Sequence, residues 1–143
     1  MKTLALCAAV ALAGVSLAAQ QTRTVPQTEA EITRVTRGEF EPLYSRHEVL
    51  VVDVRDVVAF ESGRIPGSVH APVAEITRRA ASLRKLAGSR LIVTYCSCAA
   101  EHTSAEAALL LVRAGVLHVA ALVGGYPEWV HAGGQTESGR SPR

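Results

Sequence analysis

The chain has 143 residues, of which 48% are hydrophobic and 20% charged, so its length suits one domain with a single apolar core. Its formal net charge of +2, from 15 basic and 13 acidic side chains, argues against a basic nucleic-acid-binding surface and an acidic disordered chain. Three cysteines are too few for a small domain held together by disulfide bonds.

Residues 1–19 have the pattern of a secretory signal peptide. One positive charge precedes an apolar run that begins at Leu4, and small residues follow up to Ala19. The run is short for a membrane-spanning helix. We therefore expect cleavage, no stable membrane insertion afterwards, and a periplasmic or secreted protein. The mature chain would keep two cysteines, Cys96 and Cys98.

Two polar segments flank the rest of the chain. Residues 20–33 are rich in Thr and Gln and are expected to form a linker. Residues 135–143 are polar again, which favours a disordered tail. Between them, residues 34–134 carry the apolar runs of one folded domain.

Strand and helix patterns alternate along this domain. In chain order we expect a helix at 39–46, a strand at 49–53, a short helix capped by Asp56 and stopped by Gly63, a turn at 65–67, a helix at 73–86, a strand at 91–95, a helix capped by Thr103 or Ser104 that reaches residue 114, a strand at 118–123, a turn at 124–125 and a helix at 126–131. Runs that are apolar at every position are typical of strands buried on both faces. The alternation predicts an α/β fold, a parallel sheet flanked by helices on both faces.

Cys96 stands where such a sheet places its ligands, directly after the strand at 91–95 and before a loop that leads to a helix. Free backbone amides of the loop and of the helix amino end favour an anion there. They would stabilise a thiolate, which is the nucleophilic form of cysteine. The alternative is that Cys96 only fills space as a small hydrophobic residue.

Three segments carry a resemblance to a known family. They are VVDVRDVVAFESGRIPGSVHAPV at 51–73, LIVTYC at 91–96 followed by a loop and Ser104-Ala105, and LVGGYPEW at 122–129. Together they resemble the rhodanese-like family of single-domain sulfurtransferases. The resemblance implies transfer of sulfane sulfur from a donor such as thiosulfate to a thiol or cyanide acceptor through a cysteine persulfide. It implies no cofactor, metal or nucleic acid. The implied partners are a small sulfur donor and a thiol acceptor, which can be a protein thiol, and the oligomeric state stays open.

The loop leaves two candidates for the nucleophile. Counting forward from the strand gives Cys96, whereas counting six residues back from Ser104, as in the family, gives Cys98. Strand register favours Cys96 as the catalytic residue, with Cys98 as the alternative or as a resolving thiol. The candidate substrate-binding residues are those of the loop, Ser97, Cys98, Ala99, Ala100, Glu101, His102 and Thr103, together with Arg55 and Arg64.

The charges of these candidates allow more than one interpretation. Glu101 would disfavour a dianionic donor if it faces inward, but it could also point outward or cap the following helix. His102 could supply a positive charge near neutral pH. Arg55 and Arg64 could contribute charge from neighbouring loops, although Arg55 could instead only pair with Asp53.

Two other functions fit the same residues. Cys96 and Cys98 could form a redox or persulfide relay, with a strained and easily reduced disulfide. The domain could instead be a non-catalytic binding module that holds a soft metal such as Cu(I) on both thiols and His102. A phosphatase loop is excluded, because it needs an arginine six positions after its cysteine, where this chain has His102 or Ser104.

Overall fold

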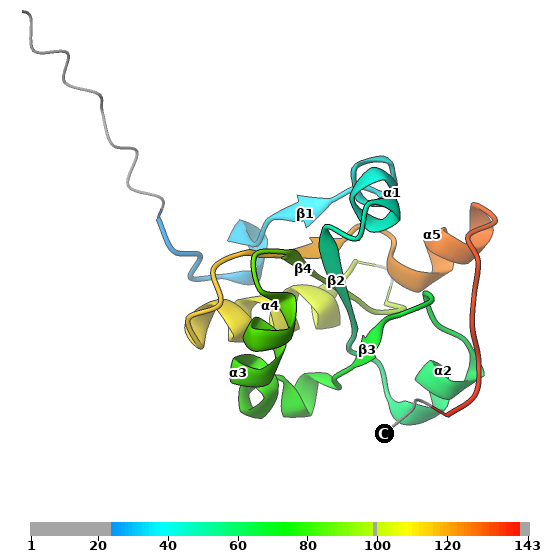
Figure 1. The fold of residues 1–143 in the computed structure, drawn as a ribbon. Helices are drawn as coiled ribbons and strands as arrows, with labels where there is room; N and C mark the ends of the chain where they lie inside the picture. The colour runs from blue at the N-terminus through cyan, green and yellow to red at the C-terminus, as the bar shows by residue number, and fades with distance from the viewer. Residues whose placement is uncertain (1–23, 99, 141–143) are drawn as a thin grey trace, which may run out of the picture.

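The computed structural model describes residues 24–98 and 100–140 (Figure 1). Its elements, in chain order, are the 3₁₀ helix η1 (Glu29–Glu31), β1 (Arg34–Val35), α1 (Arg37–Ser45), β2 (Val49–Asp53), α2 (Val57–Ser62), β3 (Val69–His70), the 3₁₀ helix η2 (Val73–Glu75), α3 (Ile76–Ala87), β4 (Leu91–Tyr95), α4 (His102–Arg113), β5 (Val119–Leu122) and α5 (Gly125–His131). The predicted signal peptide lies outside the described residues.

The strands form a parallel sheet in the order β1-β5-β4-β2-β3, which confirms the predicted α/β fold. The two long central strands, β2 and β4, have the predicted bounds, and their register pairs Asp53 with Tyr95 at the carboxyl ends. This pairing places the chain that follows β4 beside the loop that follows β2. The candidate site therefore lies at the edge expected for a parallel sheet.

Helices cover both faces of the sheet, with α3 and α4 on one face and α1 and α5 on the other (Figure 1). Successive side chains of a strand point to opposite faces. Ile92 of β4 and Cys96, the first residue after this strand, therefore belong to the core under α3 and α4. Val93 and Tyr95 belong to the core under α1 and α5. The parity of the strand thus directs the Cys96 side chain into the α3/α4 core.

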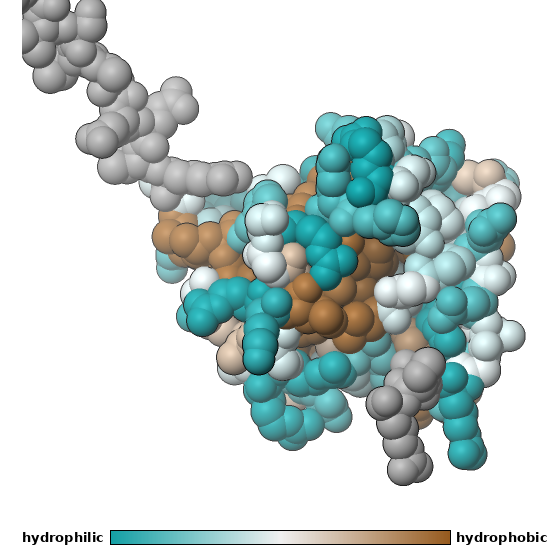
Figure 2. Space-filling view, viewed as in Figure 1, coloured by the Kyte–Doolittle hydropathy of each residue, from teal (hydrophilic) through white to brown (hydrophobic). Residues whose placement is uncertain are grey.

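The surface is mostly polar in the view of Figure 2, and hydrophobic residues gather over β2, between α1 and α3. The edge strands expose few apolar positions, since β1 and β3 contain two residues each. Within residues 24–98 and 100–140, no helix has both the length and the apolar character needed to span a membrane.

The described part of the segment predicted as a linker is packed onto the domain. η1 lies within it, and Ile32 is 4% exposed in the α3/α4 core. The Arg113 side chain of α4 donates a hydrogen bond to the Gln27 carbonyl at 3.1 Å. The predicted linker end at residue 33 is therefore too late, because Ile32 supplies apolar area that covers α4.

The predicted disordered tail is held against the domain as far as Gly139. Glu137 forms an antiparallel bridge with Arg64, and the Gly139 amide donates to the Glu61 carbonyl at 2.7 Å. Near its start, the Trp129 indole donates to the Gln135 carbonyl at 2.7 Å. The prediction of disorder is wrong for residues 135–139, because the contacts of Glu137 and Gly139 are long-range and leave no local pattern in the sequence. Residues 141–143 lie outside the described chain.

Candidate functional site

The Cys96 thiol is fixed and almost enclosed. The residue is 2% exposed, and its Sγ accepts a hydrogen bond from the Cys98 amide at 3.4 Å and donates to Ser104 Oγ at 3.7 Å. Its carbonyl accepts from the Tyr126 amide at 2.9 Å, and Gly125 lies so close to that carbonyl that a side chain there would clash. Burial raises the pKa of the Cys96 thiol, with a further increase from its hydrogen bond to Cys98.

The Cys98 thiol is half-buried and lies at the amino end of α4. Its Sγ accepts a hydrogen bond from the Thr103 amide at 3.5 Å and lies 3.6 Å from Thr103 Oγ1. Partial burial alone would raise the pKa of this thiol. The hydrogen bonds from Cys96 and Thr103 outweigh that effect and hold the pKa of Cys98 below its ordinary value. The chain therefore favours the negative charge on Cys98.

Glu101 ties the loop to the turn before α5. Its backbone is left-handed, with φ 51°, and its carboxylate accepts a hydrogen bond from the Gly124 amide at 2.8 Å. Its carbonyl accepts bonds from Ser104 Oγ at 2.9 Å and from the Ala105 amide at 2.8 Å. The helix cap is thus the backbone of Glu101, not the predicted Thr103 or Ser104, and its side chain makes no cap.

An open groove of about 520 Å³ begins at Cys98. It is lined by Cys98, Gly124, Pro127, Glu128 and His131, so α5 forms its other wall. Cys96 is not among the lining residues. A small donor that enters this groove meets the thiol of Cys98 before that of Cys96.

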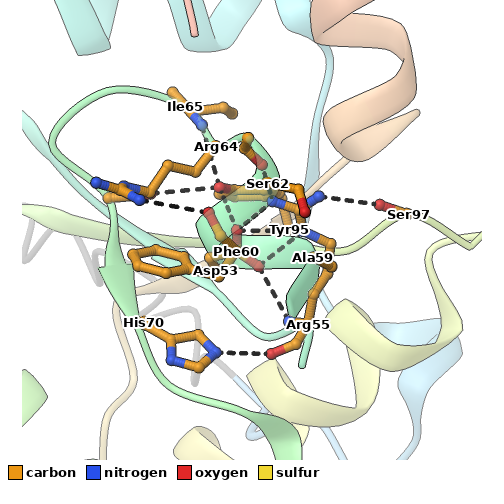
Figure 3. A network of polar contacts seen from close by, with 12 residues as sticks. Asp53, Arg55, Ala59, Phe60, Ser62, Arg64, Ile65, His70, Tyr95 and Ser97 are labelled. Atoms are coloured by element: carbon orange, nitrogen blue, oxygen red, sulfur yellow. Dashed lines mark hydrogen bonds and ion pairs between the residues drawn. The ribbon is translucent and has the colours of Figure 1, made fainter. Parts of the chain in front are cut away.

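A buried ion pair lies where β2 and β4 end, next to the loop that follows β4 (Figure 3). Asp53 is fully buried, and its carboxylate accepts hydrogen bonds from Arg55 Nε at 2.9 Å and Nη2 at 2.5 Å, and from Tyr95 Oη at 2.6 Å. Arg55 also donates to the Gly63 carbonyl at 2.6 Å, and its guanidinium stacks 4.2 Å from the centre of the Tyr126 ring. The pair joins the ends of β2 and β4 to α5.

This charge pairing shifts two pKa values. Burial alone would lower the pKa of Arg55, but the hydrogen bonds and charge of Asp53 outweigh that effect and raise it. Burial, together with the negative charge of Asp53, raises the pKa of Tyr95 far above its ordinary value. Arg55 is therefore a permanent cation and Tyr95 a neutral hydrogen-bond donor.

The sequence and the fold of this chain are similar to those of known proteins. The sequence model of the rhodanese-like domain matches residues 36–132. This chain is a rhodanese-like protein. It is 35% identical over 105 residues to the HTH-type transcriptional regulator Rv0324 of Mycobacterium tuberculosis, and this match covers 73% of the chain but 45% of that protein.

Solved structures agree with the family. The rhodanese-like domain of the Anabaena protein Alr3790 superposes with a TM-score of 0.64 at 30% identity, over 77% of this chain and 84% of that one. A thiosulfate sulfurtransferase from Pseudomonas aeruginosa gives a TM-score of 0.62 at 27% identity, over 80% of this chain and 22% of that one. The chain spans less than half the length of that enzyme and of the M. tuberculosis regulator.

Of the predicted site residues that the structure describes, Cys98 lines the groove and the others lie outside its lining. Ser97 and Ala100 are exposed, and Ser97 Oγ lies 3.4 Å from Arg55 Nη1. The His102 side chain is 78% exposed and lies 3.6 Å from Glu29, away from both thiols. Ala99 lies outside the described residues.

Arg64, a predicted substrate-binding residue, is directed to the carboxyl-terminal segment. Its guanidinium donates to Glu137 at 2.6 Å and to the Gly139 carbonyl at 2.7 Å, and it lies over the Phe60 ring (Figure 3 shows Arg64 and Phe60). Only 5% of the Arg64 side chain is exposed. Its charge therefore neutralises Glu137.

Sequence reasoning missed three groups that shape the site of this rhodanese-like domain: the Tyr95 hydroxyl, the Gly125 backbone and the Tyr126 ring. Tyr95 had a detectable signal, since a tyrosine paired in register with Asp53 needs a partner for its buried hydroxyl. Within the described residues, no three His, Cys, Asp or Glu side chains are grouped to hold a metal ion. His102, which lies beside Glu29, therefore does not join Cys96 and Cys98 in a three-ligand site in this structure.

Proposed function

We propose that this chain is a sulfurtransferase that carries sulfane sulfur as a persulfide on the loop of Cys96 and Cys98. Membership of the rhodanese-like family supports the reaction class. The observation that carries the proposal is the Cys98 thiol, which lines the groove, accepts the Thr103 amide and has a lowered pKa. An accessible thiolate held by backbone amides is the group that a covalent sulfur transfer needs.

The reaction has two transfers. The Cys98 thiolate attacks the outer sulfur of the donor, a new S–S bond forms, and the donor's own S–S bond breaks. The remainder of the donor leaves with the electron pair, as sulfite from thiosulfate or as a thiolate from an alkyl persulfide. An acceptor thiolate then attacks the terminal sulfur of the Cys98 persulfide, becomes a persulfide itself and regenerates the Cys98 thiolate.

The choice of Cys98 differs from the strand-register prediction of Cys96. The support for Cys98 is accessibility and charge, because Cys96 is 2% exposed and its pKa is raised. A thiol in that environment is mostly protonated and meets no donor that stays in the groove. Cys96 then stays a neutral thiol, which donates to Ser104 Oγ and accepts the Cys98 amide.

A second function, a persulfide relay, is favoured by the contact between the two cysteines. The Cys98 amide lies 3.4 Å from Cys96 Sγ, so both thiols belong to one tight turn. In the relay, Cys96 attacks the inner sulfur of the Cys98 persulfide, hydrosulfide leaves, and a Cys96–Cys98 disulfide remains. A dithiol reductant must then reduce that disulfide before the next cycle.

Mass spectrometry after sulfur loading tests both functions. The reduced mature chain is incubated separately with an alkyl persulfide and with thiosulfate, and the added mass is mapped to each cysteine. We expect one added sulfur on Cys98 and none on Cys98→Ser, whereas Cys96→Ser still loads. Loading of Cys96 in the wild type and in Cys98→Ser would instead support the strand-register assignment.

The two functions give different products after loading. A sulfurtransferase keeps the persulfide until an acceptor thiol is added. A relay releases hydrosulfide without an acceptor and leaves a chain two hydrogens lighter than the reduced form. Cys96→Ser would abolish that release in a relay and would leave acceptor-dependent transfer intact in a simple sulfurtransferase.

We also propose that the chain is exported, as its amino-terminal sequence suggests. The support is the single positive charge and apolar run before Ala19. Export predicts that the protein recovered from the periplasm or medium lacks about 19 residues. An intact mass that includes the whole amino terminus would contradict it.

A further inference from the structure

We propose that the groove at Cys98 selects sulfane-sulfur donors of low negative charge, such as alkyl persulfides, and disfavours the thiosulfate dianion. This inference rests on the proposed sulfur transfer and adds the class of donor. It comes from the charges around the groove.

The groove carries negative charge close to the thiol. Glu128 is one of its lining residues, and half of its side chain is exposed. Glu101 does not line the groove, but its carboxylate lies next to it, since it accepts the amide of the lining residue Gly124 at 2.8 Å.

The nearby cations are already used by other acids. Arg37 lies 3.9 Å from Glu128 but 2.5 Å from Glu41, so it is shared between two carboxylates. The Arg55 guanidinium is bound to the buried Asp53 and to the Gly63 carbonyl. Among the groove-lining residues that the structure describes, none is Lys or Arg, and His131 is the one basic side chain.

At the amino end of α4, one backbone amide is already engaged by the thiol. The Thr103 amide is directed at Cys98 Sγ, so it stabilises the thiolate and the persulfide. A dianion that approaches this thiolate meets the thiolate charge and the two carboxylates together. An alkyl persulfide carries at most one charge on its sulfur and, when protonated, none. Since the Coulomb energy scales with the product of the charges, the groove penalises thiosulfate at least twice as strongly.

A charge reversal in the groove tests this selection. Glu128→Lys changes the wall by two charge units, and kcat/KM is measured for thiosulfate and for the persulfide of an uncharged alkyl thiol. The matched control is Glu48→Lys, an exposed change of the same sign before β2, at the opposite end of the strand from the site. Glu128→Gln gives an intermediate point, and circular dichroism checks the fold of each variant.

We expect Glu128→Lys to raise the ratio of thiosulfate to persulfide kcat/KM by on the order of tenfold at low ionic strength, with a smaller gain at high salt. Glu48→Lys should leave the ratio unchanged. Sulfur loading with an unchanged ratio in Glu128→Lys would overturn this selection and leave the sulfurtransferase intact. Failure of both donors to load any cysteine would overturn the sulfurtransferase and the selection with it.

Discussion

Replacing Asp53 with asparagine should cost the domain a large part of its stability. Asp53 is fully buried and Arg55 has 8% of its side chain exposed, so little water reaches the guanidinium to replace the lost carboxylate. The asparagine amide would also place N–H donors against the Arg55 donors. Breaking a buried pair in this way lowers the free energy of unfolding by about 3–5 kcal/mol. The whole free energy of unfolding of a domain is about 5–15 kcal/mol. At about 4 °C per kcal/mol, the melting temperature should fall by about 12–20 °C.

Urea unfolding followed by tryptophan fluorescence measures this loss, because Trp129 is the single tryptophan of the chain and is 6% exposed. The control is Glu41→Gln, which removes the same charge from an exposed pair with Arg37, where the side chains are 42% and 38% exposed. An exposed pair contributes less than about 1 kcal/mol. If Asp53→Asn destabilised no more than Glu41→Gln, the claim that the buried pair joins the strand ends would be refuted.

Three further predictions concern the loop and the tail. Glu101→Ala removes the 2.8 Å bond to the Gly124 amide and should lower the unfolding free energy by about 1–2 kcal/mol, with Glu101→Gln intermediate in the same urea assay. The rate of alkylation of Cys98 should increase at pH values below the ordinary pKa of cysteine, because the pKa of Cys98 is lowered. In Cys98→Ser, the slower alkylation of Cys96 should increase only at higher pH, because the pKa of Cys96 is raised. Arg64→Ala removes the partner of Glu137, so limited proteolysis should cut residues 135–139 faster than in the wild type.

The central sheet could be predicted because its signal is local. The runs at 49–53 and 91–95 are apolar at every position, and the structure gives them the same bounds. Asp56 was also correctly expected to cap a helix, and its carboxylate accepts the Ala59 amide at 2.9 Å. Each of these features depends on residues only a few positions apart.

Features that depend on distant partners could not be predicted. β1 and β3 contain two residues each, too few for any periodicity, and they exist because β5 and β2 offer them hydrogen bonds. The ordered tail is a similar case, because Glu137 is held by Arg64, 73 residues earlier in the chain. The sequence marks this segment only as polar, which is also the composition of disorder.

The two ways of counting the loop disagreed for a structural reason. Cys96 continues the alternation of β4, so its thiol enters the α3/α4 core, and strand register locates it correctly. The loop between Cys96 and α4 ends at Glu101, whose backbone is left-handed and whose carboxylate accepts the Gly124 amide. This path returns Cys98 to the helix amino end, where the Thr103 amide meets its sulfur. Strand register thus identifies the cysteine that follows the sheet, whereas counting back from the helix identifies the thiol that faces the groove. If sulfur loads on Cys98, counting back from the helix is the method that identifies the nucleophile.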